Sequence, residues 1–249
     1  MLNVHASYGF CLNPYDACTF NKMTNGSQLT IVFHVDDCKI SHLDKKVVDE
    51  LLQQLSDRFG KETPLAITRG DVHDYLGMTI DYSIKGKVKF YMYDYIEQVL
   101  AEAEPSMSNG PSITPAGSNL FKVNNDAEKL PTDKADQFHR SVAQLLFLSK
   151  RARPDLQTVV AFLCTRVQSP DVDDEKKLGR AMRHLRETIF LPLSLGWDGI
   201  GNIYWSVDAS FAVHNGMKSH TGGVMSLGSG ALIAMSTKQK LNTTSSTVT

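Results

Sequence analysis

The sequence predicts a mixed α+β fold in which two strand-rich segments flank a helical one. Strand-forming runs separated by turn residues occur before residue 104 and after residue 191. Between residues 136 and 190, apolar side chains recur at helical spacing in three segments. The stretch 105–135 is instead rich in proline, glycine, serine and asparagine. Because 42% of the 249 residues are hydrophobic and 21% are charged, the chain can bury a sizeable core.

The N-terminal segment is expected to contain two strands and a helix. Residues 29–40 (LTIVFHVDDCKI) predict two short apolar strands around a polar turn. The next helix is expected to take Ser41 as its N-cap and to stop at Gly60. Its buried stripe is predicted from apolar residues at helical spacing, namely Val47, Val48, Leu51, Leu52, Leu55 and Phe59.

A hairpin and a short helix are predicted next. Residues 75–82 and 88–93 form the hairpin, which turns near Lys85-Gly86-Lys87, and the helix ends before Pro105. We interpret the stretch 105–135 as a linker or a long surface connection, because its composition suits neither a helix nor a strand.

Three helices and then three strands are predicted for the rest of the chain. The second helix begins after Pro154, and Asp173-Asp174 resembles the start of the third. The strands span residues 202–207, 221–227 and 231–236, with turns at Asn215-Gly216 and Gly228-Ser229-Gly230. From Lys238 the pattern indicates the start of another helix, so we expect the sequence to be truncated at Thr249.

Composition excludes several classes of protein. No apolar run approaches the roughly 18 residues of a membrane span, and the N-terminus lacks the pattern of a secretory signal. The four cysteines have no metal-ligand spacing, which favours reduced thiols in an intracellular protein. Residues 137–190 carry 10 Lys and Arg against 6 Asp and Glu. That excess is modest, so charge alone does not predict a nucleic-acid partner.

The most distinctive polar feature is the pair Asp36-Asp37 at the turn of the first predicted hairpin. Two rigid strands would present both carboxylates at the edge of the sheet. There they could hold Mg²⁺ ions that orient a triphosphate for phosphoryl transfer. The alternative is a solvated turn, because Asp-Asp is common in turns and recurs here at Asp173-Asp174. Spacing alone leaves both interpretations open.

Several motifs occur in the order found in copia-type LTR retrotransposon polyproteins. The segments FHVDD and YLGM, at residues 33–37 and 75–78, resemble the catalytic hairpin of reverse transcriptases and the segment that follows it. Thr114-Pro115, His139-Arg140-Ser141 and residues 145–155 (LLFLSKRARPD) resemble the connecting region. Residues 207–214 (VDASFAVH), 218–223 (KSHTGG) and 236–243 (STKQKLNT) resemble the opening of the ribonuclease H domain. The chain therefore resembles a fragment of this Pol polyprotein.

The resemblance implies four segments and a set of partners. The segments are a partial reverse-transcriptase palm at 1–104, a linker at 105–135, a helical connection or thumb-like region at 136–190 and a truncated ribonuclease H-like domain with a mixed sheet at 191–249. The implied activity is that of an RNA-directed DNA polymerase. Its implied ligands are Mg²⁺, deoxynucleoside triphosphates, an RNA template and an RNA–DNA hybrid, with the remainder of the Pol polyprotein as a partner. The implied location is a cytoplasmic particle or the nucleus, with no membrane partner.

The resemblance also implies that both catalytic sites are incomplete. Asp36 and Asp37 match two of three metal-binding carboxylates in the palm. The sole acid upstream is Asp16, in a loop-like NPYDAC stretch that we do not accept as the third ligand. Asp208 matches the first of about four carboxylates around two metals in the nuclease. Val248 stands where the second, a glutamate, is expected. We therefore expect this chain to be catalytically inactive.

Five basic side chains are candidate contacts to nucleic-acid phosphates: Lys150, Arg151, Arg153, Lys238 and Lys240. The alternative is that these side chains simply face water. If the five do bind phosphates, the chain could be a non-catalytic nucleic-acid-binding or interaction module derived from a retroelement.

Two histidines are a weaker candidate. His214 and His220 lie six residues apart without a third metal ligand, so we interpret them as loop residues or as contacts to a hybrid backbone.

Overall fold

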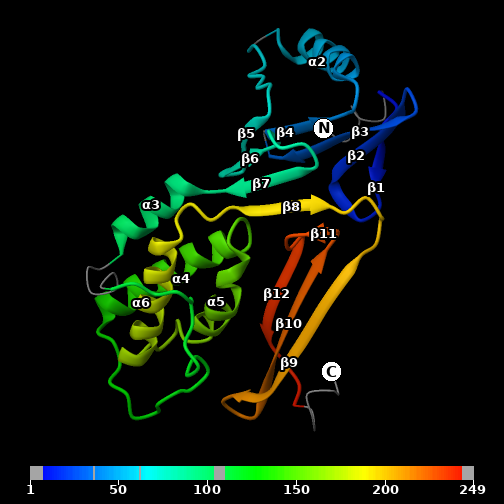
Figure 1. The fold of residues 1–249 in the computed structure, drawn as a ribbon. Coiled ribbons are helices and arrows are strands. Elements are labelled where there is room, and N and C mark those ends of the chain that lie inside the picture. Colours follow the sequence, from blue (N-terminus) through cyan, green and yellow to red (C-terminus); the bar gives the residue numbers. More distant parts are fainter. Residues whose placement is uncertain (1–7, 36, 62, 104–109, 243–249) are drawn as a thin grey trace. The chain divides into compact units, whose positions relative to one another are not determined.

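A computed structural model describes residues 8–35, 37–61, 63–103 and 110–242 (Figure 1). The chain divides into two compact units, Met1–Leu76 and Gly77–Thr249. Each unit has a hydrophobic core of its own. Within the described ranges, no helix combines the length and the apolar character needed to cross a membrane.

The first unit is an antiparallel sheet with one helix. Strands β1 (Cys11–Asn13), β2 (Asp16–Thr24), β3 (Ser27–His34) and β4 (Asp37–Ser41) pair in sequence order, and α2 (Lys45–Phe59) and β5 (Val72–Tyr75) follow. Alternate residues of the sheet, including Phe20, Leu29 and Ile31, are buried with Val47 and Leu51 of α2. The sheet therefore keeps one face for the core, as its two-residue period allows.

Two details of this unit differ from expectation. The helix begins at Lys45, because Asp44 caps it by accepting a hydrogen bond from the Lys46 amide at 2.9 Å, and Ser41 instead ends β4. The NPYDAC stretch is not a loop, because Asn13 pairs with Asp16 across a tight turn between β1 and β2. The predicted strands of residues 29–40 are confirmed as the hairpin β3–β4.

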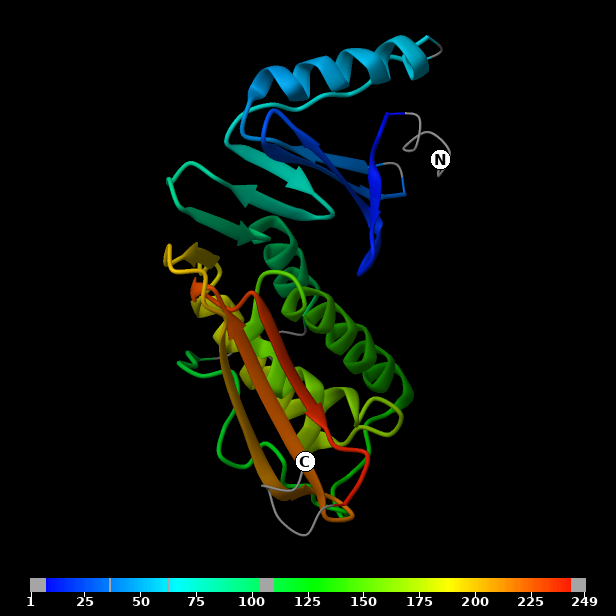
Figure 2. The same ribbon diagram turned by 90° about the vertical axis from the view of Figure 1, so that its right-hand side faces the viewer.

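The second unit joins two antiparallel sheets to a group of helices (Figures 1 and 2). One sheet has the neighbouring strands β6 (Met78–Asp81), β7 (Lys87–Tyr91), β8 (Leu193–Trp197) and β11 (Gly228–Ser229). The other has β9 (Tyr204–His214), β10 (Lys218–Ser226) and β12 (Ile233–Lys238), with β10 in the centre. The helices are α3 (Tyr93–Glu102), α4 (Thr132–Ser149), the short η2 (Pro154–Leu156), α5 (Gln157–Cys164) and α6 (Val172–Glu187).

The helical core confirms the predicted stripes. Phe138, Leu145, Leu163, Leu178 and Leu185 from α4, α5 and α6 are fully buried together. Their recurrence every three or four residues explains why each helix turns one face inward. Strand β12 lies along α5, so the second sheet packs on the same core (Figure 2).

The compact units do not follow the segments inferred from the sequence. The division falls after Leu76 and not near residue 104, because Ile96 and Val99 of α3 pack into the helical core. Within 105–135, Leu120 is buried in that core, so this part is a packed surface connection and not a free linker. Strand β9 is also longer than predicted, because β10 pairs along most of its length.

Candidate functional site

The Asp-Asp motif lies at the turn of a hairpin in the first unit. The register places His34 of β3 opposite Asp37 of β4, so the turn falls between these residues. Asp37 is exposed, whereas Asp36 lies outside the described residues. Val35 has a φ of 52°, a left-handed conformation that is rare for a β-branched residue. The hairpin thus presents Asp37 to solvent from a constrained backbone.

Tyr75 lies within electrostatic range of this turn. Burial raises the pKa of its phenol, and the neighbouring ionisable groups of Cys38 and Asp37 raise the pKa further. The Tyr75 hydroxyl is buried and has no hydrogen-bond partner in the described part of the chain. The structure therefore brings Tyr75, the first residue of the YLGM motif, near the carboxylate hairpin, although about forty residues separate them in sequence.

Asp16 begins β2 and also influences Tyr75, but its carboxylate has other partners. It accepts hydrogen bonds from the Thr19 hydroxyl at 2.6 Å and from the Cys18 amide at 2.9 Å. These bonds lower the pKa of Asp16. No group of three potential metal ligands occurs within residues 8–35, 37–61, 63–103 and 110–242. Asp16 and Asp37 therefore do not belong to such a group with other described residues, and Asp36 is outside that search.

Asp208 lies in the middle of β9, opposite Gly222 of β10. Its side chain is exposed and accepts a hydrogen bond from the Ala209 amide at 2.8 Å. Since no described cluster of ligands includes it, Asp208 is a single carboxylate on an open strand. Val248 lies outside the described residues.

Arg153 corrects one sequence-based expectation, because its side chain is only 1% exposed. Its guanidinium donates to both carboxylate oxygens of Asp155, at 2.9 and 2.7 Å, and to the Thr188 carbonyl at 2.9 Å. Burial alone would raise the pKa of Asp155, but Arg153 and then His184 hold it below its usual value. Arg153 therefore joins η2 to the C-terminal end of α6, and the fold leaves it no surface for a phosphate.

The other predicted cations differ in accessibility. Lys150 is exposed at the end of α4, whereas the Arg151 guanidinium lies 3.6 Å from the centre of the Phe147 ring. Lys238 is half-buried at the end of β12, and Lys240 is exposed beyond it. The five candidate cations therefore do not form one surface.

His214 and His220 are buried residues of β9 and β10, so their interpretation as loop residues is wrong. Their rings share a hydrogen bond of 2.9 Å, and His220 shares a second with Ser236 at 2.7 Å. Phe121 packs against both rings. Burial lowers both pKa values, and the neighbouring charges of His220 and Lys238 help to bring that of His214 to about 4.

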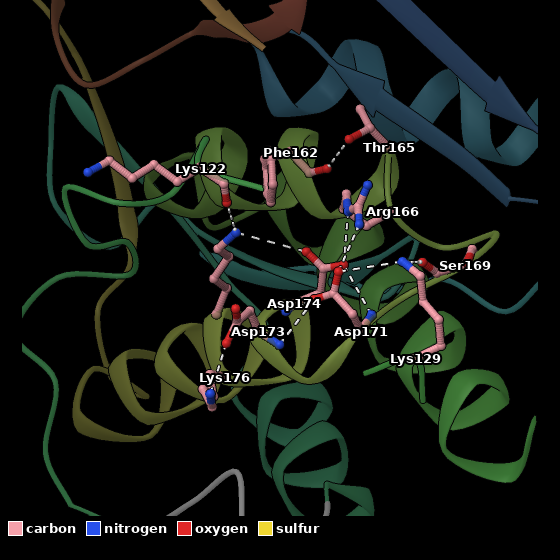
Figure 3. Close-up of polar contacts among 11 residues, drawn as sticks. Lys122, Lys129, Phe162, Thr165, Arg166, Ser169, Asp171, Asp173, Asp174 and Lys176 are labelled. Carbon is pink, nitrogen blue, oxygen red and sulfur yellow. Dashed lines mark hydrogen bonds and ion pairs between the residues drawn. The ribbon is translucent and has the colours of Figure 1, made fainter. Parts of the chain in front are cut away.

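A second buried ionic cluster surrounds the start of α6 (Figure 3). Asp171 caps this helix by accepting from the amides of Asp173 and Asp174. Arg166 donates to Asp174 at 2.9 Å and to Asp171 at 3.0 Å. Burial raises the pKa of Asp174, while hydrogen bonds and the charge of Arg166 keep that of Asp171 low. The Asp173-Asp174 dipeptide is therefore a helix start, as predicted.

Beside this cluster lies a groove of about 370 Å³ that sequence inspection missed. It is lined by the connection before α4 and by one face of α6, including Lys122, Arg180 and Arg183. The two arginines are three residues apart, which places them on one helix face. Lys122 lies far from them in sequence, so only the packed connection brings the three together.

The chain resembles two curated proteins at low identity. It is 24% identical over 238 residues to a putative transposon Ty5-1 protein of Saccharomyces cerevisiae. The aligned residues make up 95% of this chain and 74% of that protein. It is 26% identical over 182 residues to an uncharacterized mitochondrial protein of Arabidopsis thaliana, with coverages of 73% and 71%. No protein-family model matches the chain. No solved structure matches it either.

Proposed function

We propose that the chain derives from the Pol polyprotein of a copia-type retrotransposon. In this proposal it carries part of the reverse-transcriptase palm, the connecting helices and the start of a ribonuclease H domain. Similarity to a transposon protein over 95% of the chain supports a retroelement origin. The ordered motifs from FHVDD to STKQKLNT support the finer assignment.

The observation that carries the assignment is the β3–β4 hairpin. An exposed Asp37 follows a tight turn in which Val35 takes a left-handed conformation. Such strain costs about 1–3 kcal/mol and is often retained at functional sites. Tyr75 of the YLGM segment lies within range of the same carboxylate. Two-residue hairpin turns commonly need a positive φ at this position, so the unusual features are the choice of valine there and the nearby Tyr75.

The carboxylates Asp36 and Asp37 would be the Mg²⁺ ligands of the palm. The metal would neutralise the charge that develops on a transferring phosphoryl group. The pair would be an incomplete site by itself, because the only acid before it in the sequence is Asp16, which accepts hydrogen bonds from Thr19 and Cys18. We accordingly propose that the 249-residue chain does not polymerise DNA unaided.

Primer extension on an RNA template tests this proposal in two parts. The isolated chain should incorporate no nucleotides. A chimera should be active if residues 8–103 replace the corresponding segment of an active copia-type reverse transcriptase. In that chimera, Asp37→Asn should reduce incorporation by more than about 100-fold, because a metal ligand is lost. Asp57→Asn, at an exposed position of α2, is the matched control and should have no effect.

Two results would contradict the assignment. Robust extension by the isolated chain that disappears in Asp37→Asn would refute the proposed inactivity. Equal extension by the Asp37→Asn and Asp57→Asn chimeras would remove the metal role of the hairpin.

Asp208 supports a nuclease ancestry only through its motif, because it stands alone on β9. We propose that the isolated chain does not cleave the RNA strand of an RNA–DNA hybrid. Release of labelled RNA fragments in the presence of Mg²⁺ would contradict this.

A second candidate function is nucleic-acid binding without catalysis. The observation that favours it is the groove beside α6, where cations outnumber acids. Retention of a labelled hybrid by the inactive chain, with a steep dependence on salt, would support it.

A further inference from the structure

The groove beside α6 contains positive charge that the fold does not neutralise. Lys176 pairs with Asp173 at 2.8 Å, and Lys177 lies 3.9 Å from Asp174. Neither Lys122 nor Arg183 has an ion-pair or hydrogen-bond partner for its charged group within the described residues. The lining therefore separates into cations already paired and cations that remain available.

Arg180 is held in place without being neutralised. Its guanidinium donates to the Thr114 carbonyl at 3.2 Å and to the Thr114 hydroxyl at 2.9 Å. Both acceptors are uncharged, so they fix the side chain and leave its positive charge in the groove. Half-buried arginines without an acidic partner differ from an ordinary solvated helix face, where water surrounds each charge.

The connection that carries Lys122 is anchored to α6. The Lys177 ammonium donates to the Lys122 carbonyl at 2.6 Å and lies 4.6 Å from the centre of the Phe162 ring. In Figure 3 the Lys122 carbonyl faces the ionic cluster, whereas its ammonium points away from it. The backbone at this position is therefore fixed while the charged end stays free.

We infer that Lys122, Arg180 and Arg183 form a binding site for phosphate groups of a nucleic-acid backbone. Arginine forks match phosphate oxygens in two-point contacts. Arg180 and Arg183 are separated by about 4.5 Å along the helix axis, and their long side chains can extend to different phosphates of one strand. This inference rests on the proposed origin in a nucleic-acid-processing polyprotein. It assigns the contact to the groove and not to the basic cluster at 150–153.

Fluorescence anisotropy with a labelled 20-base-pair RNA–DNA hybrid tests the site. The variant Lys122→Gln/Arg183→Gln removes two unpaired charges, so the slope of log affinity against log salt should fall by about 2. Binding at about 0.1 M salt should weaken by up to about 60-fold. The control Lys85→Gln/Lys87→Gln removes two exposed charges of the β6–β7 hairpin and should change binding less than about threefold. Thermal melting checks that both variants remain folded.

Four results would overturn the inference. The first three are an unchanged slope in the groove variant, an equal loss in the control, and displacement of the hybrid by polyglutamate as readily as by unlabelled hybrid. Displacement by millimolar inorganic phosphate alone would assign the groove to free phosphate and would also overturn it.

The experiments can distinguish failure of the phosphate-site inference from failure of the proposed function. The polymerase chimera contains residues 8–103 only, whereas all groove residues lie between positions 116 and 183. Primer extension can therefore succeed while the groove binds nothing, and the reverse is equally possible.

Discussion

Two basic regions of the second unit differ in whether the fold gives their positive charges a partner. The cluster Lys150, Arg151 and Arg153 is dense in sequence, yet Arg153 is buried against Asp155 and Arg151 stacks on Phe147. In the groove, Arg180 and Arg183 are separated along α6, yet neither forms an ion pair with an acid of the described part of the chain. Charge density along the chain therefore says little about binding. What matters is whether the fold supplies an acidic partner, because an already paired cation gains little from a phosphate.

The largest expected effect comes from removing the buried cation. Arg153→Ala should lower the free energy of unfolding by about 3–5 kcal/mol, because Asp155 would lose its main charged partner and keep only His184. Lys150→Ala, at the exposed end of the same cluster, should cost less than about 0.5 kcal/mol. Urea denaturation of both variants measures the difference. If Arg153→Ala cost no more than Lys150→Ala, the two regions would not differ as described.

The histidine pair extends the comparison to buried basic groups whose described partners include no acid. The folded pKa of His214, about 4, lies below the reference value of 6.5, so protonation favours unfolding. The stability contributed by the neutral His214 is fully present above about pH 6.5 and declines as the pH falls toward 4. Protonation of His214 alone should lower the free energy of unfolding by about 2 kcal/mol between pH 8 and pH 5.

Denaturation at several pH values measures this effect. His214→Gln should flatten the decline, whereas His139→Gln, at an exposed position of α4, should preserve it. A parent protein equally stable at pH 8 and pH 5 would show that the pair is not held neutral.

A smaller effect is expected for the exposed end of the basic cluster. Lys150→Gln/Arg151→Gln removes two charges, but Arg151 is already engaged with the Phe147 ring and carbonyl. The salt slope for hybrid binding should therefore fall by no more than about 1, half the effect of the groove variant. A larger fall than in Lys122→Gln/Arg183→Gln would reverse the ranking of the two regions.

The smallest expected effect tests whether the shape of the Arg180 guanidinium matters in addition to its charge. Arg180→Lys keeps the charge but loses the fork that Thr114 holds in place. Hybrid affinity should fall by about threefold with an unchanged salt slope. Arg180→Gln provides the comparison, since it should lower the slope by about 1. Identical binding by Arg180→Lys and the parent would show that only net charge matters in the groove.

Local chemistry made much of the fold predictable. Apolar spacing identified α4, α5 and α6 and the β3–β4 hairpin, because each buries one face of a regular element. The start of α2 was misplaced by a few residues, since Ser41 and Asp44 are both competent caps and strand pairing occupies the first. The division into compact units after Leu76 depends on the packing of α3 against helices distant in sequence, which spacing does not reveal.

The sequence by itself determined the secondary structure of the helical region, the position of the Asp-Asp hairpin and the ordered motifs that indicate a retroelement. Each of these features depends on residues close together in the sequence or on the order of motifs along the chain. The sequence alone therefore contains it. Only the tertiary structure decided that Arg153 is internal, that His214 and His220 are a buried pair, and that Lys122 meets Arg180 and Arg183. Each of these depends on partners that packing alone brings together, and charge compensation cannot be read from spacing.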